Sequence, residues 1–323
     1  ISILFIELAF KILNNSGRVC YITSNQFRSA DYGKALRGSL SQKRYIEKIV
    51  DFGELPVFDG VITYVDILTL TKESHNTIKY AKIQSLPFKE PQNYTLIDTN
   101  TLKDTPWLLG CDAETTLRQK ILNSTTDTMA DVARCWSGVF TGKDKLLMWD
   151  LKEPIDFIEK SLIKSVIRAE DFSRYTNAIP SRKIFYPYKE INGQTRIIDL
   201  QELQNNYPLA YKFVMENAET LKSRKDSRKT MGDRTSWYGL IRFGDLARFN
   251  KRKIVCKGEI KKHRFGIDET KSAFSCGRVF SITVENGNAI SLEYLLGVLN
   301  SKLMEFFIHG FAPKKQGGYY SYG

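Results

Sequence analysis

The side chains best suited to chemistry in this sequence are the basic ones between residues 221 and 264. This stretch carries 15 Lys and Arg against 4 Asp and Glu, in a chain of net charge +12. Such an excess suits a polyanion, because each neutralised phosphate releases condensed counterions. The run "KSRKDSRKTMGDRTSW" has few apolar residues and is typical of a loop that lies along DNA; a mobile solvated loop is the alternative. The candidate DNA contacts here are Arg224, Lys225, Arg228, Lys229, Arg234 and Trp237.

Other arrangements of reactive side chains are weak. The triplet Glu259-Ile260-Lys261 matches the tail of a nuclease "ExK" element, which supports a metal ion, but no upstream "PD" partner accompanies it. The three histidines are isolated, and the five cysteines are far apart with no CxxC pair. We therefore expect no metal site, and reduced thiols in a cytoplasmic protein.

The elements of the first seventy residues alternate as they do in an α/β sheet. Residues 1–14 predict a helix packed on a sheet, and Arg18–Thr23 predicts a short buried strand. A second helix is expected over Asp31–Gln42, with strands at Ile46–Asp51 and Val61–Leu70. The last two strands are joined by a short link and could form an antiparallel pair. This order is the closing portion of a doubly wound sheet.

The rest of the chain predicts a mixed α+β region. Residues 72–130 are less regular, and we place a boundary near 110–130, which gives domains of residues 1–120 and 121–323. Ser291 is the expected N-cap of the last helix. No apolar run reaches the roughly 18 residues of a membrane helix. The expected short strands and helices are Asp131–Trp136, Lys183–Tyr186, Leu209–Lys225, Lys253–Cys256, Val279–Val284 and Leu292–Phe307.

The segment Gly17–Lys72 resembles the stretch after the catalytic motif of TaqI-like adenine-N6 DNA methyltransferases of restriction–modification systems. In that family a "G-G-x-x-x-x-I/V-x-P/S-x-x-W/F" strand is followed by a helix bearing "LR" and then by "I-x-x-I-x-x-F/L-G-x-x-x-F". The resemblance implies the C-terminal part of a Rossmann-like methyltransferase sheet. It also implies that Phe58 stacks on the flipped adenine, with ordinary core packing as the alternative. The matching residues are Gly17, Ile22, Ser24, Phe27, Leu36, Arg37, Ile46, Ile49, Phe52, Gly53 and Phe58.

The second half of the chain is similar to the specificity domain of that family. The resemblance implies an α+β target-recognition domain that binds double-stranded DNA. It adds a second group of candidate contacts in a Gly-containing loop, namely Trp136, Thr141, Lys143 and Lys145. Arg182 and Lys183 form a third group, and many of the aromatic residues near these groups are expected in the core. The matching segments are "CWSGVFTGKDKLLM", "IRAEDFSRY" with "RKIFYPY", "WYGLIRFGDLARFNKRKIVCKGEI" and "YLLGVLNSKLMEFFIHGFAPKKQGGYY".

Two motifs of that family are absent from the 323 residues, the Gly-rich loop that holds S-adenosylmethionine and the "(N/D)-P-P-(Y/F)" loop. The resemblance implies that both lie upstream of Ile1. S-adenosylmethionine is then the cofactor of a longer enzyme, and this chain alone is inactive. A nuclease domain or subunit elsewhere in the system is left open. A stand-alone DNA-binding specificity protein is the alternative, and the two motifs in the upstream reading frame would decide for the enzyme.

Overall fold

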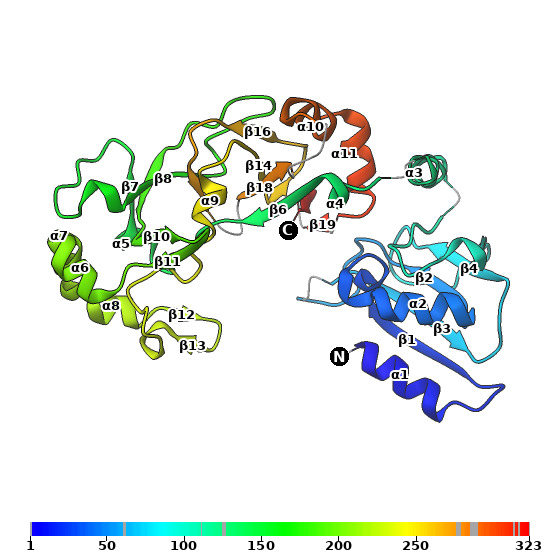
Figure 1. Ribbon diagram of the computed structural model, residues 1–323. Coiled ribbons are helices and arrows are strands. Elements are labelled where there is room, and N and C mark those ends of the chain that lie inside the picture. The colour runs from blue at the N-terminus through cyan, green and yellow to red at the C-terminus, as the bar shows by residue number, and fades with distance from the viewer. Residues whose placement is uncertain are drawn as a thin grey trace. The chain divides into compact units, whose positions relative to one another are not determined.

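The computed structural model describes residues 2–60, 63–110, 112–124, 127–275, 279–284, 290–312, 314–315 and 317–322. The chain divides into two compact units, Ile1–Thr126 with Phe306–Gln316, and Asp127–Glu305 with Gly317–Gly323. Each unit contains both helices and strands (Figure 1). The architecture is therefore mixed α and β, with several separate sheets.

The first unit is built on a five-stranded sheet of order β1-β3-β2-β4-β5. Strands β2 and β4 are parallel neighbours, and the other neighbouring pairs are antiparallel. Because β3 is antiparallel to both β1 and β2, those two strands run in the same direction. The strands are β1 (Arg18–Ser24), β2 (Ile46–Asp51), β3 (Val65–Thr71), β4 (Thr77–Lys82) and β5 (Thr95–Asp98), and the helical elements are α1 (Ser2–Ile12), η1 (Asn25–Arg28), η2 (Asp31–Gly33), α2 (Lys34–Lys43), η3 (Thr99–Thr101) and α3 (Ala113–Asn123).

Helix α2 covers one face of this sheet (Figure 1). Its Leu36 and Leu40 share a buried cluster with Ile49 of β2 and Leu68 of β3. Helical spacing puts both leucines on one side of α2, and burial of such side chains stabilises a fold by about 1.5–3 kcal/mol each. The helix ends at Arg44, whose left-handed backbone (φ 55°) allows its N–H to bond to the Leu40 carbonyl.

The buried Arg37 explains the "LR" part of the motif in structural terms. Only 2% of this residue is exposed. Its guanidinium donates to the carbonyls of Phe27 (2.7 Å), Ala30 (2.8 Å) and Asp104 (2.8 Å). These carbonyls belong to loops that no sheet ladder satisfies, so Arg37 serves as their shared donor.

The predicted order of elements in this unit is confirmed, with three differences. Strand β1, predicted to be buried, is an edge strand in which Thr23 is the one buried residue. The third strand is Val65–Thr71, while residues 61 and 62 of the prediction lie outside the described part of the chain. The expected antiparallel pairing of β2 with β3 is present. The sequence did not predict β4 and β5, because β4 is short and its apolar residues alternate with Thr and Lys.

The second unit contains two four-stranded sheets, of orders β16-β14-β18-β6 and β17-β8-β9-β7, and two hairpins, β10-β11 and β12-β13. The strands are β6 (Ala133–Ser137), β7 (Met148–Asp150), β8 (Ile163–Ile167), β9 (Arg182–Phe185), β10 (Tyr188–Ile191), β11 (Gln194–Ile197), β12 (Lys225–Asp226), β13 (Lys229–Thr230), β14 (Lys253–Lys257), β15 (Glu259–Ile260), β16 (Phe265–Asp268), β17 (Ala273–Phe274), β18 (Val279–Val284) and β20 (Tyr319–Ser321). The helical elements are α4 (Met129–Val132), α5 (Asp144–Leu147), η4 (Lys160–Leu162), α6 (Leu200–Asn206), α7 (Pro208–Glu216), α8 (Ala218–Lys222), η5 (Met231–Asp233), α9 (Leu246–Phe249) and α10 (Leu292–Leu299). Helix α11 (Lys302–His309) is divided between the units after Glu305, and β19 (Lys314–Lys315) belongs to the first.

A fully buried ion pair joins two strands of the second unit. Lys253 of β14 faces Asp268 of β16 across the ladder, and neither residue is exposed. The carboxylate also accepts from the backbone N–H groups of Thr270 and Ser272, and the ammonium donates to the Phe249 carbonyl at 2.9 Å. A buried charge pair with such complete hydrogen bonding is tolerated, and it fixes which residues stand opposite each other.

The predicted helix Leu292–Phe307 is two helices, α10 and α11. The expected N-cap is confirmed, since the Ser291 hydroxyl accepts from the Tyr294 N–H at 3.1 Å. The break falls at the fully buried Asn300, whose amide bonds to both backbone groups of Phe265 (2.9 and 3.1 Å). The Arg174 guanidinium bonds to the Asn300 carbonyl, which a continuous helix would need. The predicted helix Leu209–Lys225 is similarly divided into α7 and α8.

Candidate nucleic-acid interface

Three parallel strands of the first unit end at one edge of its sheet. Strand β1 ends at Ser24, β2 at Asp51 and β4 at Lys82. In α/β sheets, ligands bind outside the carboxyl ends of the strands. The loops that follow these three strands are therefore the candidate substrate-facing part of this unit.

Phe58 lies in the loop that follows β2 and is 41% exposed. The base of the loop is fixed by the Phe52 N–H, which donates to the Val65 carbonyl at 3.1 Å. Phe52 itself is buried, with 2% exposure. Of the two aromatic residues in the motif, Phe52 anchors the loop, and Phe58 presents its ring to solvent. This placement leaves the ring free to stack on a base, and the stacking itself stays a prediction.

A buried charged cluster lies beneath this loop. Asp51 and Asp66 are directly opposite each other on β2 and β3, and Arg28 contacts both. The guanidinium nitrogens Nη1 and Nη2 lie 3.0 Å from Asp51 Oδ2, and Nε lies 3.2 Å from Asp66 Oδ2. The hydroxyl of Tyr80 and the N–H of Gly53 also donate to Asp51, at 3.0 and 2.7 Å. The cluster thus joins strands β2, β3 and β4 to Gly53 at the base of the Phe58 loop.

The two carboxyl groups of this cluster ionise differently. Burial raises the pKa of Asp66 from its ordinary 3.8 to about 7, because the single guanidinium is shared with a second acid. Burial alone would also raise the pKa of Asp51, but Arg28 and the hydrogen bonds from Gly53 and Tyr80 hold it below its usual range. At neutral pH one negative charge therefore sits on Asp51, and Asp66 is near its midpoint. Sequence reasoning missed this cluster, because the contact between the two Asp residues depends on the register of β2 and β3.

Arg224 corrects the predicted set of DNA contacts in the second unit. It is 4% exposed, and its guanidinium donates to the carbonyls of Thr141 (2.6 Å), Leu221 (2.9 Å), Trp237 (2.7 Å) and Gly239 (2.7 Å). Burial lowers its pKa to about 10, so the group stays charged at neutral pH. All of these donors are occupied inside the protein, and Arg224 has none directed to DNA.

The prediction that Thr141 contacts DNA is wrong for the same reason, because the residue is buried. It is 1% exposed, and its hydroxyl accepts from the Lys143 N–H (2.9 Å) and donates to the Asp144 carboxylate. It shapes the turn that begins α5. Gly142 follows with φ +70°, and a Cβ there would collide with Ile241. Thr141 and Gly142 thus build the turn, while the side chain of Lys143 remains exposed.

Arg224 brings several of the predicted residues together. Its bonds connect the turn at Thr141 with the start of hairpin β12–β13 and with the backbone of Trp237. Lys143 and Lys145 are exposed on the turn, and the Lys222 ammonium lies 4.9 Å from the Trp237 ring centroid. The structure therefore joins the hairpin and Trp237 of the first group to the Thr141 turn of the second group through one buried guanidinium.

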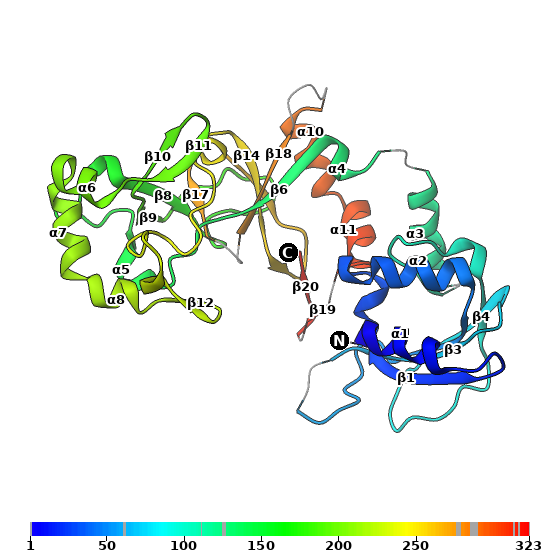
Figure 2. The ribbon, with the colours of Figure 1, turned by 60° about the horizontal axis from the view of Figure 1, so that its bottom comes forward.

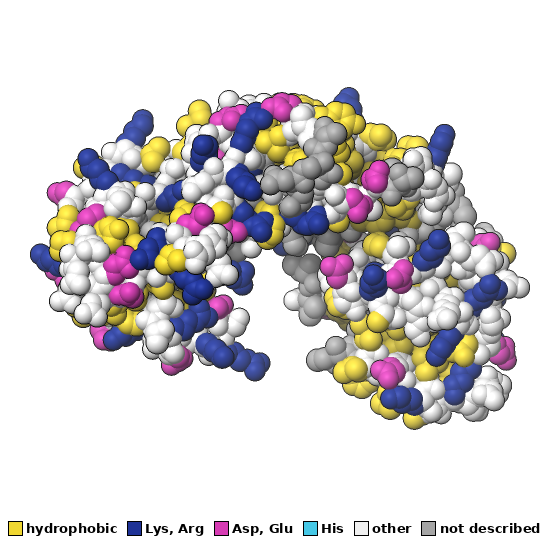
Figure 3. Space-filling model, viewed as in Figure 1, with side chains coloured by type: hydrophobic (Ala, Val, Ile, Leu, Met, Phe, Trp, Pro, Cys, Tyr) yellow, Lys and Arg dark blue, Asp and Glu magenta, His cyan; other side chains and the backbone are white. Residues whose placement is uncertain are grey.

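Three exposed basic side chains of the first group of candidates lie on the hairpin β12–β13. It projects beside α8 in both ribbon views (Figures 1 and 2), and Lys and Arg side chains gather at its end (Figure 3). Lys225, Arg228 and Lys229 are exposed, and the tight turn places Ser227 at φ 57°. Arg234 is only partly available, because it pairs with Asp226 at 2.8 Å.

The remaining predicted contacts are less free. Trp136 on β6 is half-buried, its indole N–H donates to Thr283 at 3.2 Å, and the Arg248 guanidinium covers its ring. Arg182 on β9 lies 3.5 Å from Asp150, and the Lys183 ammonium donates to the Glu153 carbonyl. The third group is thus engaged by acceptors on strand β7 and in the loop that follows it.

The described residues contain neither a candidate metal site nor a candidate membrane-spanning helix. No group of three His, Cys, Asp or Glu side chains there is arranged to hold a metal ion. None of the helices described is long and apolar enough to cross a bilayer. The sequence contains neither of the two motifs that the resemblance assigns to S-adenosylmethionine and to the adenine amino group.

Comparison with known families places both ends of the chain in one class of protein. Residues 1–58 match the family model described as Eco57I restriction-modification methylase, and residues 197–322 match the TaqI-like C-terminal specificity domain. The resemblance seen in the sequence is thereby confirmed: the chain is related to restriction–modification methyltransferases and ends in a TaqI-like specificity domain. Phe58 is the last residue of the first match, and the β12–β13 hairpin lies within the second.

Individual relatives agree with this assignment. The type II restriction enzyme and methyltransferase RM.Eco57I of Escherichia coli is 25% identical over 94% of this chain and 33% of its own length. The type II methyltransferase M.BanIII of Aneurinibacillus aneurinilyticus is 23% identical over 90% of this chain and 56% of its own length. The chain therefore spans between a third and somewhat over half of these relatives.

A solved structure supports the fold. The type IIL restriction-modification enzyme MmeI, determined in complex with DNA, superposes with a TM-score of 0.56 over 100% of this chain and 39% of its own. The sequence identity is 11%, so this likeness shows the fold alone.

Proposed function

We propose that this chain is part of a site-specific DNA adenine-N6 methyltransferase of a restriction–modification system. One observation carries the proposal. The exposed basic hairpin β12–β13 and the Lys143–Lys145 turn are held together by the buried Arg224, next to Trp237. Exposed Lys and Arg of this kind bind phosphates, and an Arg at a tip can read guanine edges. Most of this surface falls within the match to a specificity domain.

The first unit is, in this proposal, the closing part of a Rossmann-like catalytic sheet. Strand β1 is an edge strand, and the outer face of α1 exposes Leu4 (67%), Phe5 (55%) and Ile12 (78%). An unpaired strand edge beside an apolar helix face is unfavourable in water unless another part covers it. Further strands of a catalytic domain would cover both. We accordingly propose residues 1–120 as catalytic-domain sequence and 121–323 as the target-recognition domain.

The division of chemical labour follows from which groups are present. S-adenosylmethionine supplies the methyl group in enzymes of this kind, and its binding loop belongs to a part of the polypeptide outside this sequence. The present chain grips duplex DNA and offers Phe58 as an aromatic face for the extruded adenine. The isolated chain then binds DNA but does not methylate it. A DNA-modifying enzyme of this type acts in the cytoplasm, and a nuclease domain or subunit would lie outside these residues.

A DNA titration tests the proposal directly. Duplex DNA of mixed sequence is titrated against the 323-residue chain over a series of salt concentrations, with fluorescence anisotropy as the readout. We expect the logarithm of the binding constant to fall linearly with the logarithm of salt, and the slope to shrink in a variant that replaces Lys225, Arg228 and Lys229 by Ala. The matched control is Lys160→Ala with Lys212→Ala and Lys302→Ala, which removes three exposed lysines outside the hairpin. Absence of binding at every salt concentration would remove the proposed function.

The stacking role of Phe58 needs the full-length enzyme. Phe58→Ala should lower methyl transfer to unmethylated genomic DNA without unfolding the protein, because the ring is exposed and supports no core cluster. Base–aromatic stacking is worth about 1–3 kcal/mol, which corresponds to a loss of roughly tenfold to a hundredfold. Phe58→Trp keeps an aromatic face and should restore most of the rate. Equal activity in the wild type and the Ala variant would end the assignment.

A further inference from the structure

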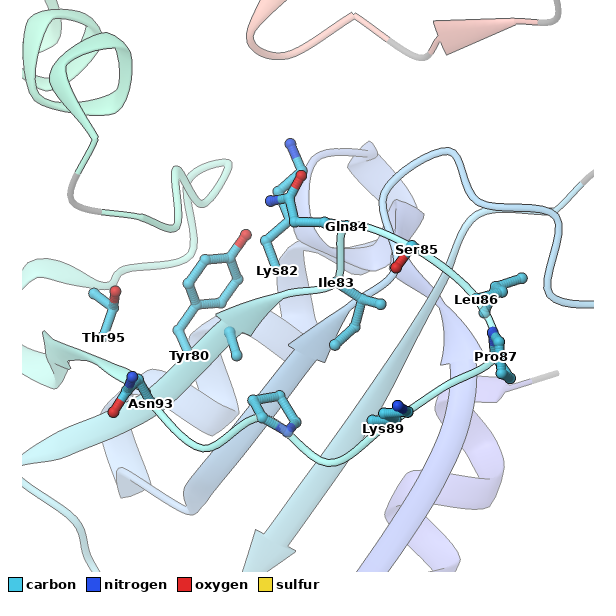
Figure 4. A pocket seen from close by; sticks show the side chains of 12 residues that line it. Tyr80, Lys82, Ile83, Gln84, Ser85, Leu86, Pro87, Lys89, Asn93 and Thr95 are labelled. Carbon is cyan, nitrogen blue, oxygen red and sulfur yellow. The ribbon is translucent and has the colours of Figure 1, made fainter.

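A polar pocket of about 490 Å³ lies at the carboxyl end of β4 (Figure 4). Tyr80 and Lys82 of β4 form one side, and the loop that connects β4 to β5 forms the rest. Gln84, Ser85 and Asn93 supply hydroxyl and amide groups to the lining, and Lys89 supplies a second ammonium. The pocket is therefore rich in hydrogen-bond donors, and its two ionised side chains are both positive.

The charges of this pocket are not neutralised within the protein. Neither Lys82 nor Lys89 forms an ion pair among the described residues, and both side chains are exposed. The carboxylate of Glu90, in the same loop, already accepts two hydrogen bonds, from Lys48 at 2.8 Å and from Tyr94 at 2.5 Å. The hydrogen bond from Lys48 is the main reason that the pKa of Glu90 lies below its usual range. A net positive pocket with a neutralised neighbouring acid is suited to an anion.

The pocket is coupled to the loop that carries Phe58. The rings of Phe52 and Phe88 lie 5.3 Å apart and join the two loops. A Cβ built on Gly53 would lie 3.4 Å from Cε of Lys82, so the lysine side chain runs beside the base of the Phe58 loop. Strands β2 and β4 are parallel neighbours, which is why their following loops meet at one edge. An anion in the pocket would thus sit next to the segment proposed to hold the flipped base.

We propose that this pocket receives a phosphate of the DNA backbone next to the extruded nucleotide, with Lys82 and Lys89 as its charged contacts. The inference rests on the proposed function, because it needs DNA bound to the first unit. Rotation of a nucleotide out of the helix displaces the phosphates on either side of it. Ammonium groups that are already placed for the displaced phosphate stabilise the extruded state, whereas they make no base-specific contact. Ser85 and Asn93 add neutral donors at the same site.

The test compares two pairs of lysine variants in the 323-residue chain. The probe is a fluorescein-labelled duplex of mixed sequence that carries adenines opposite abasic sites, because a missing partner base lowers the cost of extrusion. The test variant is Lys82→Ala with Lys89→Ala. The control is Lys79→Ala with Lys103→Ala, which removes the same charge; Lys79 lies on β4 but on the opposite face of the sheet from Tyr80.

The expected result is a change in salt dependence for the test variant alone. Loss of one phosphate contact should reduce the slope of log binding constant against log salt by about 0.9. When the salt concentration is raised fourfold, the affinity of the test variant should therefore fall by a factor about 3.5 times smaller than the factor for the wild type. Thermal unfolding should be unchanged in both variants, because the removed side chains are exposed.

Three results would overturn the inference, and each is separable from failure of the proposed function. An unchanged slope in the test variant, together with a reduced slope in the hairpin variant, removes the phosphate pocket and leaves the DNA-binding function. Equal reductions in test and control variants show a general charge effect and also remove it. A slope reduced equally on fully paired duplex shows that the lysines do not act on the extruded state. Only a wild-type chain that fails to bind DNA counts against the proposed function itself.

Discussion

Replacement of Asp66 by Asn should stabilise the first unit at pH 8 and leave it unchanged near pH 4. Asp66 is fully buried, and its pKa is raised from 3.8 to about 7. Each tenfold change in the acid constant corresponds to 1.36 kcal/mol, so a rise of this size corresponds to roughly 4 kcal/mol. The folded state holds the proton more tightly than the unfolded chain. This contribution to stability is therefore complete below about pH 4 and is lost as pH rises to about 7.

The Asn side chain imitates the protonated acid and removes this loss. It keeps an oxygen for Arg28, and its amide group can donate toward Asp51, which is ionised throughout the range. Because Asp51 contributes equally to the wild type and the variant between pH 5 and 8, it largely cancels in the comparison. The gain in the free energy of unfolding should grow from near zero at pH 4 to about 4 kcal/mol above pH 7.

Hydrogen exchange measures the gain in the free energy of unfolding separately for the first structural unit. Protection of amides in β2 and β3, corrected for the intrinsic pH dependence of exchange, should rise by as much as about a thousandfold at pH 8 in Asp66→Asn. Strand β14 of the second unit is the internal reference and should not change. Asp51→Asn is the opposing control. It removes the acceptor of Arg28, Tyr80 and Gly53 and should lower protection at pH 8. A gain that is equal at pH 4 and pH 8, or absent at both, would refute the account of the cluster.

Two further predictions concern the second unit. Arg224→Ala should lower its stability by about 3 kcal/mol or more, because four carbonyls lose a charged donor, and it should weaken DNA binding through disorder of the hairpin. Arg228→Ala is the matched control: urea unfolding should change by less than about 0.5 kcal/mol while DNA affinity falls. Asn300→Ala should cost about 2 kcal/mol in the same unfolding assay, since the Phe265 N–H loses its partner and the Phe265 carbonyl keeps only the Tyr175 N–H, at 3.0 Å. A stability equal to wild type in Asn300→Ala would contradict the reading of the helix break.

The sequence was informative where periodicity and burial coincide. Strand Ile46–Asp51 was predicted with its observed bounds, and the segment Val279–Val284 with those of β18, because β-branched apolar side chains are frequent in both. The Ser291 cap was predicted for a similar reason, since the signal is local. The break at Asn300 was not, because it depends on a partner at Phe265 that is distant in sequence. A leucine-rich stretch predicts one helix unless that contact is known.

The candidate site was harder to predict because charge alone does not reveal its partner. Arg224 stands in a run of basic residues, and nothing local distinguishes it from Arg228. One is 4% exposed and bonds to carbonyls, and the other is exposed at the turn of a hairpin. The pairing of Asp66 with Arg28 likewise depends on the register of β2 and β3, which places two acids opposite each other. Such groups are recognised only after the topology is known.

Three buried polar residues follow one physical rule. Arg37, Arg224 and Asn300 all bond to backbone groups of other segments, at Phe27, Thr141 and Phe265. A residue with this duty is constrained by the fold, so it can recur among relatives that recognise different DNA sequences. Base recognition instead requires side chains that change without loss of the fold, and exposed tips such as Arg228 meet that requirement. Changes of DNA specificity should therefore fall on the hairpin and on the turn at Lys143, while the buried Arg224 keeps both in place.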